Sequence, residues 1–475
     1  MRRILLLYLL LGCLGTVGAA DAVAGSRPRV LVTTDGEIDD HCSMVRFLLY
    51  ANEWDVEGII YSSSQYHWQG SKLWSGTSWV NPYLEAYAQV HPNLLRHDPR
   101  YPTADFLRSR VAVGNISAEG EMDELTPGAQ RIVDVLLDAR DTRPVWLLAW
   151  GGTNTIARAL KSIEEQHPER IAEVARKARL YLVWEQDDTY QRYLRPHWEK
   201  HGLQSIISDQ FLVFFYHWKK YLPPAQQAVL AAPWMKANLL DHHGPLLALY
   251  QARRAGEAGF DEGDFRSEGD SVAFLHTLPT GLRSDESPGW GGWGGRFVRV
   301  RANTWLDPVT EPGYRYPDGR WYTQTAWGRV RLRHEIPHDA ALTAYLEPQW
   351  RWLIAIQNDF AARADWCVKG FKDANHAPRV TVAGPLDRTV RAGDTVALSA
   401  IGTDPDHDVL AFRWWQDRDA DTVDSSVTIR NSDTADRASF VVPNEPGHTV
   451  HIILEVTDHG APPLVSYRRI VFTLR

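Results

Sequence analysis

Three aspartates crowd one short turn of the sequence. Asp35, Asp39 and Asp40 lie within six residues, directly after an apolar run that begins at Val30. Carboxylates this close repel one another unless a positive charge neutralises them, and Ca²⁺ takes carboxylate oxygens at roughly 2.3–2.6 Å. The spacing therefore indicates a metal site. The alternative is a polar turn in which one aspartate caps the following helix.

The flanking elements decide where this turn lies. The apolar run is typical of a buried parallel strand. The segment after the turn has apolar side chains at helical spacing, namely Met44, Val45, Leu48 and Leu49. We therefore expect the aspartates at the carboxyl end of a strand, where ligand sites of α/β sheets collect.

Composition narrows the class of protein. The chain has 475 residues, 44% of them hydrophobic and 23% charged, which is typical of a globular protein with two to four domains. Its formal net charge of -8 argues against nucleic-acid binding through a basic surface. The twenty tryptophans are numerous enough to supply both core side chains and platforms for sugar rings.

The first twenty residues predict a signal peptide. Two arginines precede an apolar run from Ile4 to Leu11, and small residues follow up to Ala20. We expect residues 1–20 to be removed and the protein to be secreted or periplasmic. A lipoprotein anchored through Cys13 is the alternative. No other segment is apolar for long enough to predict a membrane span, and the sequence leaves a homo-oligomer open.

The segment from 27 to 300 alternates strand-like and helix-like stretches, which predicts a mostly parallel sheet flanked by helices. Residues 301–373 are less regular and are expected to close this first domain. From 374 to 475 the apolar pattern changes to period two, with turns rich in Asp, Pro and Gly. That pattern predicts an immunoglobulin-like all-β sandwich.

The acidic turn resembles the N-terminal aspartate motif of the nucleoside hydrolases, whose pattern is Asp-x-Asp-Pro-Gly-x-Asp-Asp. The last three acids of that pattern match Asp35, Asp39 and Asp40, whereas Thr33, Gly36 and Glu37 depart from it. The resemblance implies that Asp35 and Asp40 bind Ca²⁺, that Asp35 deprotonates the attacking water, and that Asp39 contacts sugar hydroxyls.

Two further segments resemble the family's remaining metal ligands. Trp150 begins Trp-Gly-Gly-Thr-Asn-Thr, similar to the family segment whose backbone carbonyl binds the metal. Asp270 matches the acid of the family's late His-Asp pair, with Gly269 in place of the histidine. The alternatives are a buried aromatic at Trp150 and a helix cap at Asp270.

Other positions resemble the family's substrate contacts. Gln65 falls where the family has a sugar-binding Asn, and Glu185 and Asp187 fall near its sugar clamp. The segment containing Trp290 and Trp293 is similar to a glycine-tryptophan signature of a divergent secreted branch, which includes a cellulose-binding protein with a C-terminal β domain. These tryptophans are expected either to stack on sugar or to close a structural loop.

Together these features predict a secreted, Ca²⁺-dependent hydrolase of N- or O-glycosidic bonds, in which a metal-activated water attacks the anomeric carbon and Asp35 is the base. Its partner would be a glycan or glycoside. The rival hypothesis is a non-catalytic protein that binds polysaccharide on the same scaffold. A nucleoside scavenger is a third hypothesis.

Overall fold

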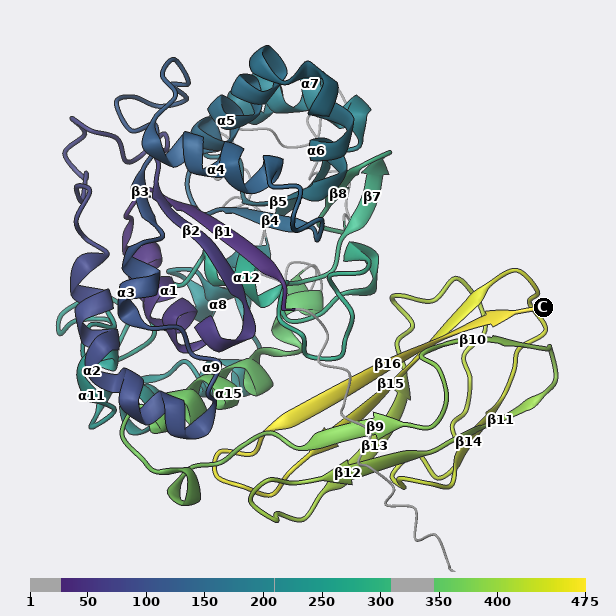
Figure 1. Cartoon of the computed structure of the whole chain (residues 1–475). Helices are drawn as coiled ribbons and strands as arrows, with labels where there is room; N and C mark the ends of the chain where they lie inside the picture. The colour runs from purple at the N-terminus through teal and green to yellow at the C-terminus, as the bar shows by residue number, and fades with distance from the viewer. Residues whose placement is uncertain (1–26, 209, 309–345) are drawn as a thin grey trace, which may run out of the picture.

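The computed structural model describes residues 27–208, 210–308 and 346–475. The expected signal peptide, with Cys13, lies outside these residues, as does 309–345 of the expected extension. Figure 1 shows an α/β region followed by an all-β region at the C-terminal end of the chain. The predicted α/β class of the first region is therefore confirmed.

One eight-stranded sheet forms the centre of the first region. Its strands are β1 (Arg29–Thr34), β2 (Asp55–Tyr61), β3 (Val111–Val113), β4 (Val145–Ala149), β5 (Ala178–Val183), β6 (Gln204–Ser208), β7 (Val298–Arg301) and β8 (Thr304–Leu306). Their order is β3-β2-β1-β4-β5-β6-β8-β7, and every neighbouring pair is parallel except β7 with β8. The sheet therefore runs a few residues beyond position 300.

Helices cover both faces of this sheet. They are α1 (Ile38–Leu49), α2 (Asn81–His97), α3 (Ala104–Arg108), α4 (Pro127–Leu137), α5 (Asn154–Gln166), α6 (Ile171–Lys177), α7 (Arg195–Trp198), α8 (Trp218–Tyr221), α9 (Pro224–Ala228), α10 (Ala232–Met235), α11 (Gly244–Leu247), α12 (Ser271–Leu275) and α15 (Leu353–Trp366). No helix in the described ranges is long and apolar enough to cross a membrane.

The first region has two hydrophobic cores, one on each face of its sheet. Val30 and Val32 of β1 pack on the face covered by α1, α2, α12 and α15. Leu31, between them, packs on the opposite face with α4, α5 and α6. Successive side chains of a strand point to opposite faces of the sheet. A strand in a sheet that helices cover on both faces therefore needs a continuous apolar run. The strand is thereby fixed, and so is the position of its carboxyl end.

The C-terminal region consists of strands in three sheets. A four-stranded sheet has the order β10-β16-β15-β13, and β11 pairs with β14 and β12 with β9. The strands are β9 (Arg379–Val382), β10 (Asp387–Val390), β11 (Thr395–Leu398), β12 (Ala400–Thr403), β13 (Ala411–Gln416), β14 (Ala438–Val441), β15 (Thr449–Thr457) and β16 (Val465–Leu474). The predicted β-strands are therefore present, with Trp414 in their shared core.

Backbone hydrogen bonds join the two regions. The amides of Tyr467 and Arg469 on β16 donate to the carbonyls of Thr280 and Gly281. Arg469 also donates from its buried guanidinium to the carbonyls of Leu282 and Trp290. These bonds connect the end of the α/β region to a long strand of the β region.

Candidate functional site

The acidic turn lies at the carboxyl end of β1, in the centre of the parallel sheet. Gly36, with φ of +76°, turns the chain from β1 into α1 in a conformation that favours glycine. Asp39 and Asp40 then occupy the first turn of α1, where the helix dipole favours negative charge. Asp40 Oδ2 accepts a hydrogen bond of 3.0 Å from the amide of Glu37, the N-cap residue. Glu37, not an aspartate, is therefore the N-cap residue, and Asp40 takes part in a capping box with it, while Asp40 Oδ1 accepts from the hydroxyl of Thr34.

Asp270 joins the turn from a distant part of the chain. Carboxylate oxygens of Asp39, Asp40 and Asp270 all lie within 4.8 Å of one another. Asp270 stands at the N-cap position of α12, yet its side chain makes no capping hydrogen bond. Its Oδ2 is buried without a hydrogen-bond partner in the described part of the chain. The carboxylate is thus not used as a helix cap and faces the other two acids.

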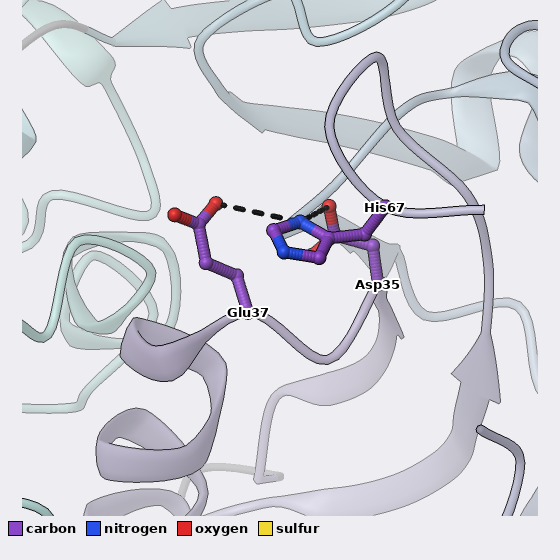
Figure 2. Close-up of side chains that lie close together, drawn as sticks. All are labelled: Asp35, Glu37 and His67. Carbon is purple, nitrogen blue, oxygen red and sulfur yellow. Dashed lines mark ion pairs between the residues drawn. The ribbon is translucent and has the colours of Figure 1, made fainter. Parts of the chain in front are cut away.

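Asp35 belongs to an adjoining group with Glu37 and His67 (Figure 2). His67 Nδ1 lies 3.6 Å from Asp35 Oδ2 and 3.7 Å from Glu37 Oε2. Asp35 is 2% exposed, and neither of its carboxylate oxygens has a hydrogen-bond partner among the described residues. A buried carboxylate whose oxygens accept no hydrogen bond, and whose paired group is one imidazole, favours a further ligand, because burying an ionised group with few partners is costly.

The five acids of the two groups differ in pKa. Burial favours the neutral form of Asp35, but the imidazole of His67 outweighs this and lowers the pKa of Asp35. Burial and the charge of Asp35 raise the pKa of Asp39 to about 7. Burial and neighbouring carboxylates also raise the pKa values of Glu37, Asp40 and Asp270 well above the ordinary range. These acids therefore cannot all be ionised together unless a cation neutralises them.

A hard cation fits the donors present. The site offers the unpaired oxygens of Asp35 and Asp270 together with the carboxylates of Asp39 and Asp40, all of them oxygen ligands. Ca²⁺ and Mg²⁺ prefer carboxylate and carbonyl oxygen, whereas zinc and copper sites draw more on sulfur and imidazole. The expected ligands Asp35, Asp40 and Asp270 do fall into two adjoining groups rather than one.

The backbone carbonyl expected to act as a ligand, that of Trp150, already has a donor. Gln186 Nε2 donates to it at 2.5 Å and also to the carbonyl of Val183 at 3.2 Å. This amide ties the end of β4 to the end of β5. A carbonyl oxygen has two lone pairs, so one remains for a further contact. The Trp150 side chain itself is buried, 1% exposed, in the core under α1 and α12.

Three of the expected sugar contacts, Gln65, Glu185 and Asp187, differ in how their polar atoms are used. Asp187 accepts hydrogen bonds from the amides of Asn154 and Thr189 and from the hydroxyls of Thr153 and Thr189, so its carboxylate is saturated. Glu185 accepts from Gln191. Gln65, by contrast, has a buried Nε2 without an acceptor in the described ranges. Of the three, Gln65 therefore has the donor most available to a ligand.

The tryptophans of the glycine-tryptophan segment contact the β region. The ring of Trp290 packs edge-on against His451 and lies 4.8 Å from the guanidinium carbon of Arg283. Its carbonyl accepts a hydrogen bond from Arg469. Trp293 is only 4% exposed. These contacts place Trp290 against the β region.

A buried ion pair holds together the two helices that carry the acids. Arg46 of α1 donates to both carboxylate oxygens of Glu268, at 2.5 and 3.0 Å, and both side chains are fully buried. Ser271, the first residue of α12, donates to Glu268 Oε2 at 2.7 Å. Glu268 therefore positions Asp270 relative to the aspartates of α1.

Sequence patterns did not single out Glu37, Arg46 or Glu268 as part of the site. Glu37 looked only like a departure from the family's motif, and the other two lie far apart in the chain. His67 follows β2 at the carboxyl edge of the sheet, where polar residues collect at ligand sites. The same positional signal, a polar residue just after a parallel strand, could have identified Glu37.

Two family models match this chain. Residues 29–297 match the family described as "Cellulose-binding Sde182, nucleoside hydrolase-like domain". Residues 395–474 match "Cellulose-binding protein Sde0182, C-terminal domain". No curated protein sequence gives a significant match.

Two solved structures illustrate the likeness. A nucleoside hydrolase-related hypothetical protein from Saccharophagus degradans, associated with carbohydrate metabolism, is 30% identical, with a TM-score of 0.75 over 95% of this chain and 100% of that one. A plant nucleoside hydrolase is 12% identical over 67% of this chain and 98% of that one, with a TM-score of 0.30. The first likeness extends over both regions of the chain.

Proposed function

We propose that this chain, which belongs to the cellulose-binding Sde182 family with its nucleoside hydrolase-like domain, hydrolyses glycosidic bonds. The observation that carries the proposal is the buried carboxylate of Asp35, whose two oxygens accept no hydrogen bond in the described part of the chain and which lies with Glu37 and His67 beside a group of three further aspartates. A protein that only binds glycan has no need of a base there. We further propose that the protein is secreted, with residues 1–20 as its signal peptide.

In this proposal Asp35 is the general base. It takes a proton from a water that attacks the anomeric carbon, the bond to the leaving group breaks, and the departing atom takes up a proton from solvent. The anomeric carbon passes through an oxocarbenium-like state. General-base help of this kind contributes about 10²–10⁴ in rate. His67 supports the role of Asp35 because it keeps the carboxylate ionised and therefore able to accept the proton.

We propose Ca²⁺ as the cofactor, held by Asp35, Asp40, Asp270 and the carbonyl of Trp150. When bound, the cation neutralises the carboxylates and polarises water and sugar hydroxyls. Asp39 and Gln65 are proposed to bind sugar hydroxyls, as acceptor and donor respectively. For Glu185 and Asp187 we propose that they shape this sugar subsite, since both are buried at the carboxyl end of β5.

The experiment is a hydrolysis assay on a panel of aryl glycosides, ribonucleosides and soluble oligosaccharides, with added Ca²⁺ or with a chelator. We expect turnover of at least one glycoside class, loss of it in chelator, and a loss of about 10²–10⁴ for Asp35→Asn. The matched control is Asp105→Asn, which changes a carboxylate that is 93% exposed on α3. A wild-type protein that turns over no member of the panel contradicts the hydrolase proposal.

Polysaccharide binding is the second candidate, and one observation favours it. Both matched families are described as cellulose-binding. For the C-terminal region we accordingly propose an immunoglobulin-like sandwich that presents a glycan-binding surface, supported by its all-β composition. Retained binding to insoluble cellulose by an Asp35→Asn protein without turnover would show that binding does not depend on the catalytic base.

A further inference from the structure

A cleft lies between the two regions, away from the carboxyl end of β1. One wall is α15 with the turn that precedes it, and the other is the face of the β13–β15–β16 sheet that does not contribute to the sandwich core. The cavity volume is about 480 Å³, within the range of roughly 300–1,000 Å³ of small-molecule sites. In Figure 1, α15 lies beside the end of β16 that faces the α/β region.

Two tryptophans and a tyrosine form the aromatic part of this cleft. Successive residues of β13 point to opposite faces, so Trp414 enters the sandwich core whereas Trp415 points toward α15. The ring of Trp415 lies 6.1 Å from that of Trp352, with 38° between their planes. Tyr467 packs edge-on against Trp352 at 5.4 Å. The rings form a bent aromatic wall in which Trp352 and Tyr467 are only 5% and 2% exposed. The half-buried ring of Trp415, with the guanidinium carbon of Arg413 5.6 Å from its centroid, therefore offers most of the aromatic surface to a ligand.

The polar lining of the cleft carries no net charge. Its charged members are two arginines and two glutamates. Arg413 pairs with Glu455 at 3.2 Å across the β13–β15 ladder, and Arg351 pairs with Glu347. Each positive charge is thus compensated by a neighbour. Such a cleft offers many hydrogen-bond donors and acceptors without attracting either an anionic or a cationic ligand.

We propose that this cleft, the Trp415 cleft, binds a segment of a neutral glycan chain. The C–H face of a sugar ring is apolar and stacks on an aromatic ring, while the hydroxyl groups at its edge need donors and acceptors in the same plane. The aromatic wall meets the first need, and Arg413, Glu455 and Asn358 meet the second. A peptide or a charged polymer would leave one of these features unused.

The inference rests on the proposed function only for the choice of glycans as the ligand class. It adds a binding site that is separate from the carboxylates. Loss of glycan binding in the cleft can therefore be distinguished from loss of hydrolysis at the carboxylates. Because the cleft contains residues of both regions, a glycan held there would contact both of them at once. The cleft would then retain the polymer while the carboxylate site acts on a terminal or released fragment.

The test measures binding of cellohexaose, a neutral soluble oligosaccharide, by titration calorimetry to the full chain. We expect Trp415→Ala to weaken binding by about tenfold or more and Trp415→Phe to weaken it less. Phe106→Ala, which removes a half-exposed ring on α3, is the matched control and should leave binding unchanged. Asp35→Asn should also leave it unchanged, whatever its effect on turnover.

A second measurement guards against a Trp415→Ala protein that fails to fold. Hydrogen exchange of the wild-type protein with cellohexaose should show added protection in 411–416 and 453–457. Protection confined to the turn after β1, or no binding of cellohexaose by the wild type, would overturn the proposal. So would unchanged affinity in folded Trp415→Ala, or tighter binding of an oligogalacturonate than of cellohexaose.

Discussion

His67 Nδ1 lies 3.6 Å from Asp35 Oδ2 and 3.7 Å from Glu37 Oε2, so one imidazole stands between two buried or half-buried carboxylates. Asp35 and Glu37 are two residues apart, yet their pKa values shift in opposite directions. Burial acts on both, but the imidazole outweighs it at Asp35, whereas the charges of Asp39 and Asp35 reinforce it at Glu37. The imidazole is therefore the group that keeps the proposed base ionised.

Replacing His67 should shift the pH dependence of activity. In His67→Ala, burial is left to raise the pKa of Asp35, so the acid limb of the kcat/KM profile should move to higher pH. A charged neighbour at this distance changes a carboxyl pKa enough to move the limb by about one to three pH units. The control is His197→Ala, which removes a half-exposed histidine paired with Glu164. An acid limb that does not move in His67→Ala would contradict the role given to this imidazole.

Removing the cation should destabilise the protein most at high pH. The folded-state pKa of Asp39 is about 7, above its unfolded value of 3.8, because of burial and the charge of Asp35. The folded state therefore binds more protons between these values, and in chelator the free energy of unfolding should fall as pH rises from 4 to 7. Asp39 alone contributes at most about 4 kcal/mol, since one pKa unit corresponds to about 1.4 kcal/mol.

Denaturant unfolding at pH 5 and pH 8, with Ca²⁺ and with chelator, checks this prediction. Ca²⁺ at a hundredfold excess over its dissociation constant stabilises by about 2.7 kcal/mol, and we expect a larger gain at pH 8 than at pH 5. Mg²⁺ serves as the comparison cation. Equal stability of the cation-free protein at both pH values would contradict the expected coupling of the carboxylates.

The sequence predicted the position of the acidic turn but not all of its contacts. The apolar patterns of strand β1 and helix α1 indicate which of their side chains are buried. The turn between them was therefore expected at the carboxyl edge of the sheet. The pair of Arg46 with Glu268 could not be predicted in the same way, because 222 positions separate its members. No periodic pattern in the sequence links two charged residues that lie so far apart in the chain.

Trp290 and Trp293 show a second limit of sequence interpretation. A tryptophan beside glycines has the same pattern whether it stacks on a sugar or packs at a domain junction. In the structure Trp290 contacts Arg283 and His451, and its carbonyl accepts a hydrogen bond from Arg469, contacts that the sequence pattern does not predict. The order of the C-terminal strands was likewise not determined by period-two patterns, because alternation predicts strands without their order.

Breaking the buried pair beneath the site should be costly. Arg46→Met leaves the buried carboxylate of Glu268 without its cation, and the free energy of unfolding should fall by about 3–5 kcal/mol. The double variant Arg46→Met with Glu268→Met should be less destabilised, because it leaves no unpaired charge. Urea unfolding of both variants measures the difference. A double variant less stable than the single one would contradict an electrostatic cause and point to packing instead.

Gly269 lies near the site and Gly281 lies where the two regions meet. Replacing each of them with alanine tests a different effect. At Gly269 an added Cβ would lie 2.6 Å from Asp39 Oδ2, a side-chain atom that can move. At Gly281, φ is +89° and the Cβ would meet the backbone carbonyl of Tyr467, which is held in β16. Gly269→Ala should therefore weaken Ca²⁺ binding or turnover with little change in stability. Gly281→Ala should cost more than about 2 kcal/mol in the free energy of unfolding without changing affinity for the cation.

Calorimetric titration with Ca²⁺ and thermal unfolding, applied to both proteins, separate the two effects. The expected effect of each substitution depends on which atom the added methyl group contacts. A carboxylate displaced from its position changes the charge that faces the cation, whereas a displaced β-strand carbonyl breaks the backbone hydrogen bonds between the two regions. If Gly269→Ala binds Ca²⁺ like the wild type, then the position of the Asp39 carboxylate does not affect the cation, and Asp39 acts on the substrate alone.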